Sequence, residues 1–130
     1  MGIAFDNSNL IVGDLSPEAG RSAAHQLLGK EKLPDAVFAA NDSCAASCMT
    51  EFKRAGIRIP EQTMFAGFNN DLIAAMIEPN LTTIDYKGHE MGQIAARTLI
   101  NRLNNPENFN VTQSIVIRHE LLVRNSSQSV

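Results

Sequence analysis

Amide and carboxylate side chains follow three apolar segments of the sequence, at the point where each segment ends. "VFAANDS" runs from an apolar stretch into Asn41 and Asp42, "MFAGFNN" ends on Asn69 and Asn70, and Asp14 follows "LIVG". Carboxylates accept hydrogen bonds, and amides both donate and accept them. These residue types could therefore bind the hydroxyls or ring nitrogens of a small polar ligand.

The spacing of these groups indicates that they share one place in the fold. If the three apolar segments are parallel strands, their carboxyl ends meet at one edge of a sheet, where such folds bind ligands. Two apolar side chains would lie against a sugar ring or a base at that edge. No Gly-rich phosphate loop follows a strand, which argues against a nucleotide site. The candidate ligand residues are Asp14, Leu15, Asn41, Phe68, Asn69 and Asn70.

Each of these polar residues also has a purely structural interpretation. Asp42 or Asn41 could cap the helix that begins there, and Asp14 could cap an earlier helix. The pair at 69–70 could form an Asx-type turn without binding anything. The sequence leaves these alternatives open.

Catalytic and metal chemistry find little support in the sequence. His25, His89 and His119 fall outside the predicted ligand edge, and no G-x-S-x-G elbow is present. Cys44 and Cys48 lie one helical turn apart, without the further ligands of a structural zinc site. A disulfide over this spacing would be strained, so we expect two thiols that pack as small apolar groups. We expect no enzymatic activity, no cofactor and no metal.

Strands and helices are predicted to alternate along the chain. The pattern favours an α/β fold with a parallel sheet flanked by helices on both faces. The tail "NSSQSV" is predicted to fray. The expected elements are a strand at 9–13, a helix capped by Ser16 and ended by Gly29, a strand at 36–40, a helix ended by Gly56, a strand at 63–67, a short helix stopped by Pro79, a strand in "LTTIDY", a helix at 88–103 and one or two strands in "VTQSIVIRHELLVR".

Length and charge limit the class of protein. A chain of 130 residues suits one domain with its own core. The net charge of −3 argues against a surface for nucleic acid or anionic membrane. No apolar run approaches the roughly 18 residues of a membrane span, and the start lacks the features of a signal peptide. We therefore expect a cytoplasmic location.

Several segments in this order resemble the effector-binding domain of LacI/GalR (lac-repressor) family transcriptional regulators. They are "GDLSPEAG", "PDAVFAANDSCA", "KRAGIRIPEQTMFAGFNND" and "EPNLTTIDYKGHEMGQIAARTLINRL", and the resemblance extends over about residues 2–124. Each segment is weak alone, but "AGIRIPE", "GFNN" and "LTTI…EMG" are specific in combination.

The resemblance implies one lobe of a type I periplasmic-binding-protein-like fold, with a crossover segment. Residues 1–130 would form the C-terminal lobe of the effector-binding domain, with its core at about 9–85 and 119–125. The crossover segment at about 86–118 would normally pack on the N-terminal lobe. That lobe and a helix-turn-helix DNA-binding headpiece are expected outside these 130 residues.

The resemblance also implies roles for three residues of the ligand edge. Leu15 matches a position that is often aromatic in the family, and Asn41 matches an effector-binding Asn. Asn69 stands where the family usually has the first Asp of "G-[FY]-D-D". An amide can still pair with hydroxyls, but it loses the charge-assisted hydrogen bonds of a carboxylate. The resemblance implies a small effector that is sugar-like or a related metabolite, and the replacement of Asp by Asn at position 69 departs from the typical sugar site.

Two apolar surfaces follow from the resemblance. A helical stripe would face the absent lobe and would otherwise be exposed or covered by a second copy; its members are Met91, Ile94, Leu99 and Leu103. A homodimer is therefore expected, either conventional or with this segment exchanged between copies. A second dimer interface is expected at Ala45, Cys48, Met49, Leu72, Ile73 and Met76.

Two functions remain open from the sequence. The first is a fragment of a LacI-type regulator that binds a small effector and dimerises, with operator DNA bound only through the headpiece. The alternative is half of a sugar-type solute-binding protein that feeds a transporter, since the two classes share a fold.

Overall fold

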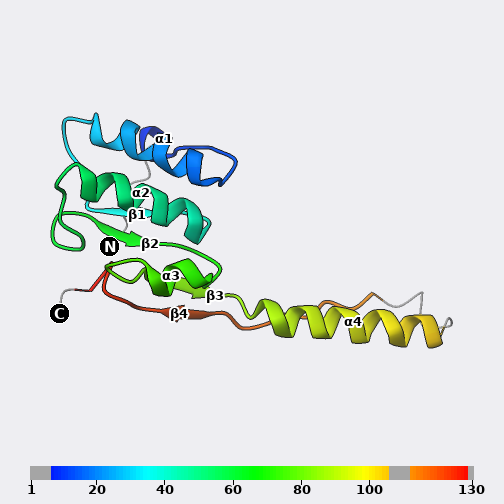
Figure 1. The fold of residues 1–130 in the computed structure, drawn as a ribbon. Helices are drawn as coiled ribbons and strands as arrows, with labels where there is room; N and C mark the ends of the chain where they lie inside the picture. The colour runs from blue at the N-terminus through cyan, green and yellow to red at the C-terminus, as the bar shows by residue number, and fades with distance from the viewer. Residues whose placement is uncertain (1–6, 106–111, 129–130) are drawn as a thin grey trace, which may run out of the picture.

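The computed structural model describes residues 7–105 and 112–128, which form an α/β fold (Figure 1). Helices and short strands alternate along most of the chain, as expected. No helix in the described part of the chain is long and apolar enough to cross a membrane. The elements are η1 Asn7–Asn9, α1 Pro17–Leu28, β1 Ala36–Phe38, α2 Asp42–Arg54, β2 Met64–Ala66, α3 Leu72–Met76, β3 Thr83–Asp85, α4 Gly88–Asn104 and β4 Glu120–Leu122.

The predicted parallel arrangement is present in the centre of the fold. Strands β1 and β2 pair in parallel, with Val37 opposite Phe65. A parallel bridge between Ala66 and Thr82 continues this pairing toward β3. Strand β4 then returns antiparallel to β3. The ends of β1 and β2 therefore point the same way, as the predicted ligand edge requires.

Local capping signals set the helix ends. Ser16 Oγ accepts a hydrogen bond from Ala19 N (3.1 Å) at the start of α1, and Gly29 caps its end. The N-cap of α2 is Asn41, whose Oδ1 accepts from Cys44 N (2.9 Å). Gly56 follows the end of α2 with φ of +81°, a conformation that suits glycine. These boundaries confirm the predicted helices.

Two predicted features near the chain ends are wrong. No strand forms over 9–13 in the described structure, where Val12 is 86% exposed. A strand needs a partner for its backbone groups, and its apolar pattern alone does not supply one. The tail is also not frayed as far as it is described. Ser126 is fully buried, its Oγ donates to Phe65 O (2.7 Å), and its carbonyl accepts from Phe65 N (2.8 Å).

The core lies between the sheet and helices α1, α2 and α3. Phe52 and Phe65 meet edge to face at its centre, with ring centroids 5.1 Å apart. The opposite face of the two parallel strands carries exposed side chains, including Phe38 and Met64. Helices α1, α2 and α3 cover the other face in the described part of the chain. The core residues are Ala24, Leu27, Ala45, Cys48, Met49, Phe52, Phe65, Ala74 and Leu81.

Helix α4 extends away from the rest of the molecule, and the chain returns along it toward β4 (Figure 1). None of the 17 residues of α4 is buried. Lys87 links the outgoing and returning segments, because its Nζ donates to Asp85 Oδ2 (2.9 Å) and to Glu120 Oε2 (3.0 Å). These hydrogen bonds raise the pKa of Lys87, and the bond from Lys87 lowers the pKa of Asp85. The link lies next to both ends of the segment at about 86–118, for which the crossover stays a prediction.

Candidate functional site

Hydrogen bonds and close packing bring the three predicted loops to one edge of the fold. Asp42 N donates to Phe68 O (3.0 Å), which joins the end of β1 to the end of β2. Helices α1 and α2 approach closely near their N-termini, since a Cβ built on Gly20 would lie 2.4 Å from Cys44 O. The loop that precedes α1 therefore lies next to the loop that precedes α2. We name this edge, residues 14–15, 41–42 and 68–71, the rim.

The rim holds unusual backbone conformations. Leu15, Asn69 and Asn70 have φ of +64°, +116° and +57°. The left-handed region is uncommon for residues other than glycine, although asparagine tolerates it. Leu15 has no such tolerance, and its side chain is 43% exposed. Conformations of this kind concentrate at binding sites, where the surrounding structure holds them in place.

The sequence left open whether Asn41 or Asp42 caps α2, and the two residues have different roles in the structure. Asn41 is the helix cap, and capping occupies its amide oxygen while its NH2 group remains able to donate. Asp42, the alternative cap, is instead the first residue of α2 and is fully buried. Its Oδ1 accepts from Thr83 Oγ1 (2.7 Å) and its Oδ2 from Asp71 N (2.8 Å). Asp42 therefore holds the rim loops in place from within the core and does not face a ligand.

The two asparagines of "GFNN" face different partners. Asn70 Oδ1 accepts from Arg124 Nη2 (2.8 Å), and the same guanidinium donates from Nη1 to Leu81 O (2.9 Å). Asn70 thus ties the rim to the C-terminal segment. Asn69 N donates to Ile84 O (3.0 Å), and its side-chain Nδ2 lies 3.3 Å from Asp71 Oδ2. No sequence pattern pointed to Arg124 or Asp71, because both act through contacts that only the fold creates.

Asp14 adds a negative charge to the rim. Its Oδ1 accepts from Ser16 N (3.0 Å), and hydrogen bonds from Ser16 lower the pKa of the carboxyl group. Asp14 therefore supports the start of α1 beside the Ser16 cap. An ionised carboxylate here favours a ligand that offers hydrogen-bond donors and disfavours an anion.

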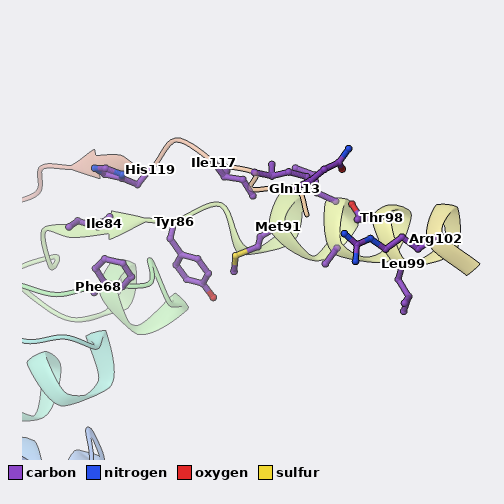
Figure 2. A pocket seen from close by; sticks show the side chains of 13 residues that line it. Phe68, Ile84, Tyr86, Met91, Thr98, Leu99, Arg102, Gln113, Ile117 and His119 are labelled. Carbon is purple, nitrogen blue, oxygen red and sulfur yellow. The ribbon is translucent and has the colours of Figure 1, made fainter. Parts of the chain in front are cut away.

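A cleft of about 700 Å³ opens beside the rim, between α4 and the returning segment (Figure 2). The ring of Phe68 stacks on Tyr86 at one end, with centroids 5.9 Å apart and planes 12° apart. Phe68 belongs to both the rim and the cleft, so the two are continuous. The cleft is lined by Phe68, Ile84, Tyr86, Met91, Ile94, Ala95, Thr98, Leu99, Arg102, Gln113, Ile115, Ile117 and His119.

The predicted stripe on α4 is largely exposed in the described structure. Met91, Leu99 and Leu103 are 47%, 59% and 64% exposed, while Ile94 is half-buried. These side chains are not part of the core, and their packing against an N-terminal lobe stays a prediction.

The predicted dimer interface divides into two parts. Ala45, Cys48 and Met49 lie in the core and are at most 2% exposed, so the expectation that they face a partner is wrong. The stripe they form packs inward because α1, β2 and α3 surround it. Leu72 and Met76 on α3 are 75% and 69% exposed, and Ile73 is 37% exposed. The interface prediction is therefore kept for α3 alone.

The two cysteines are free thiols, and the core raises the pKa of Cys48 to about 12 by desolvation. Because the thiolate is the reactive form, iodoacetamide should alkylate Cys48 more than about tenfold more slowly than half-buried Cys44 at pH 8. Mass spectrometry of timed samples measures both rates. In 8 M urea, used as the control, the rates should converge. Equal rates in the folded chain would contradict the burial of Cys48.

The fold and the rim define a class of protein that comparisons also identify. The family model for the periplasmic binding protein-like domain matches residues 4–127, and the chain belongs to this family. Its relatives are LacI-type transcriptional regulators. The chain is 35% identical over 126 residues to the HTH-type transcriptional regulator DegA of Bacillus subtilis, and 31% identical over 129 residues to the HTH-type transcriptional repressor CytR of Escherichia coli K12. These matches cover 97% and 99% of this chain.

Solved structures give the same result. The structure of the transcriptional regulator CelR–cellobiose complex matches 96% of this chain with a TM-score of 0.85 at 27% identity. The Escherichia coli transcriptional repressor AscG matches 98% with a TM-score of 0.84 at 26% identity. The chain spans 38% and 45% of those two structures, and 36% and 37% of DegA and CytR.

Proposed function

We propose that this chain is the effector-binding part of a LacI-type transcriptional regulator and that its rim binds a small neutral ligand rich in hydroxyl groups. The family and its relatives support the class. The observation that carries the ligand site is the meeting of three loops, at 14–15, 41–42 and 68–71, two of which hold residues with left-handed backbone conformations. The rim presents amide and carboxylate groups beside Leu15 and Phe68, which suits a sugar with polar edges and an apolar ring face.

Two related structures with bound sugars support the ligand class. CelR is described in complex with cellobiose, and a LacI family regulator from Enterococcus faecium with bound ribose. The Enterococcus protein is 29% identical to this chain, with a TM-score of 0.77. Cellobiose and D-ribose are therefore the first ligands to test.

A thermal-shift screen of mono- and disaccharides tests the proposal, with cellobiose and D-ribose included. A ligand at 100 times its dissociation constant should add about 2.7 kcal/mol to the free energy of unfolding. Asn69→Ala should abolish the shift, because it removes an amide from the rim. The matched control is Asn101→Ala on exposed α4, which should retain the shift. Loss of the shift in both variants, or in neither, would contradict binding at the rim.

The proposal places DNA binding in a helix-turn-helix segment outside these 130 residues. The chain carries a net charge of −3, which disfavours contact with phosphates. The purified chain should therefore not retard operator DNA in a gel. Retardation that weakens steeply with added salt would contradict this assignment.

We also propose that the chain forms a homodimer, because α3 and α4 both present exposed apolar side chains. Multi-angle light scattering on a sizing column should give about twice the mass of 14.2 kDa. Leu72→Asp should shift the mass toward the monomer if α3 is the contact, and Leu99→Asp should do so if α4 is the contact. A monomeric wild-type chain would contradict the proposal. The solute-binding alternative is not favoured, because the relatives are transcriptional regulators.

A further inference from the structure

An acidic residue, Asp71, follows the two asparagines of the rim, and its carboxylate contacts the side chain of Asn69. Resting on the proposed function, we propose that Asp71 is the specificity-determining residue of the rim. Its carboxylate accepts from the Asn69 NH2 group, so that the Asn69 oxygen is the atom presented to the ligand. The bound ligand must then supply a hydrogen-bond donor at Asn69.

The chemistry of the two groups fixes this orientation. Asn69 Nδ2 lies 3.3 Å from Asp71 Oδ2. An ionised carboxylate can only accept, so it can pair with the NH2 group of an amide and not with the amide oxygen. The amide orientation therefore follows from its partner. Asn69 Oδ1 is left as the group that this side chain offers to a ligand.

Buried contacts hold Asp71 in place. Its backbone N–H donates to Asp42 Oδ2 (2.8 Å), and Asp42 is fully buried. The other oxygen of Asp42 accepts from Thr83 Oγ1 (2.7 Å), and that hydroxyl in turn accepts from Asn70 N (3.3 Å). Because these hydrogen bonds already order the loop at 69–71, the loop loses little conformational entropy when a ligand binds. Asp42 is the positioning residue of this arrangement.

The acceptor oxygen of the neighbouring amide is already engaged. Asn70 Oδ1 already accepts from Arg124 Nη2. The negative charge that "GFNN" lacks is thus supplied by Asp71 one residue later, where it acts on the ligand through Asn69. A hydroxyl satisfies the exposed acceptor, whereas an anionic group would meet both the amide oxygen and the nearby carboxylate. The inferred ligand class is a neutral polyol or sugar rather than a sugar phosphate or sugar acid.

Side-chain amide NMR tests the orientation without any ligand. In the 15N-labelled chain, the Asn69 NH2 protons should exchange with solvent more slowly than those of exposed Asn101. Asp71→Ala should remove this protection, and Glu61→Gln, which removes an exposed charge elsewhere, should preserve it. Unprotected Asn69 protons in the wild-type chain, or protection that survives Asp71→Ala, would overturn the proposal.

Binding measurements then test specificity separately. With cellobiose or D-ribose as the probe, Asp71→Ala should weaken binding about threefold to tenfold, as expected for one ordered hydrogen-bonding group. The same variant should lower the ratio of the dissociation constant for D-ribose 5-phosphate to that for D-ribose. An unchanged preference would overturn the specificity role. If neither sugar binds the wild-type chain, these two sugars are not the ligands of the proposed function. The NMR result still decides the orientation of the Asn69 amide.

Discussion

Replacing Phe52 with alanine should lower the free energy of unfolding by about 3–5 kcal/mol, the usual loss for a buried aromatic side chain. Phe52 is fully buried and packs edge to face on Phe65. It also joins α2 to the sheet, so the cavity would lie where α1, α2 and β2 meet. Domains of this size are stable by about 5–15 kcal/mol, so the variant would lose a large fraction of the total stability. Urea unfolding followed by circular dichroism measures the change.

Phe38→Ala is the matched control for this prediction. Phe38 has the same side chain but is 62% exposed on β1. Its truncation should change the free energy of unfolding by no more than about 0.5 kcal/mol, as is usual at an exposed position. Similar losses in the two variants would show that a partner or another element covers Phe38, and would contradict the assigned core.

Helix boundaries were predictable because their signals are local. A serine before a proline fixed the start of α1, and a glycine in the left-handed region marks the end of α2. Such signals need only a few neighbouring residues. The predicted strand at 9–13 failed for the opposite reason, since a strand depends on a partner that is distant in sequence.

The tail shows how a nonlocal contact overrides a local pattern. "NSSQSV" has no apolar residue before Val130, so composition predicts an unpacked end. In the structure, Ser126 Oγ accepts from Thr82 N and donates to Phe65 O. Ser126 therefore occupies a buried place beside β2 and satisfies backbone groups there. Nothing in the tail itself could have indicated these partners.

The meeting of the rim loops at one edge could be predicted from the sequence, but the contacts of each side chain there could not. The strand-end rule brings together the loops after β1 and β2 because it depends only on strand direction. The loop at 14–15 has no strand before it and reaches the same edge through the packing of α1 on α2. Consecutive polar residues point in different directions, and the sequence does not say which one turns inward. Asp42 turned into the core and Asn70 turned to Arg124, whereas Asn69 stayed at the rim beside Asp71.

The prediction that Ala45, Cys48 and Met49 face a partner was wrong for a related reason. Ala45, Cys48 and Met49 form a regular helical stripe, and such a stripe shows only that one face is apolar. It does not distinguish a core face from an interface. The short helix α3 carries its exposed apolar side chains, Leu72 and Met76, without any comparable stripe.

Gly67 connects the core to the rim, and Gly67→Ala should destabilise the chain by about 2–3 kcal/mol through overpacking. A Cβ at this position would lie 2.2 Å from Asp42 Oδ1 and 3.0 Å from Leu81 Cδ2. The added methyl group must displace the carboxylate that accepts from Thr83 and Asp71. Urea unfolding measures the loss, and amide hydrogen exchange of residues 68–71 should show faster exchange than in the wild-type chain.

Gly92→Ala is the matched control, because a Cβ at Gly92 would meet no atom within 4 Å. Gly92 lies inside α4, where alanine should stabilise the helix by about 0.5–1 kcal/mol. The same substitution is thus expected to have opposite effects at the two sites. Unlike Phe52→Ala, the Gly67 variant should disturb the rim beyond its effect on global stability, since the displaced group is the one that holds Asp71. Unchanged exchange at 68–71 despite the lost stability would contradict the role of Asp42 in positioning the rim.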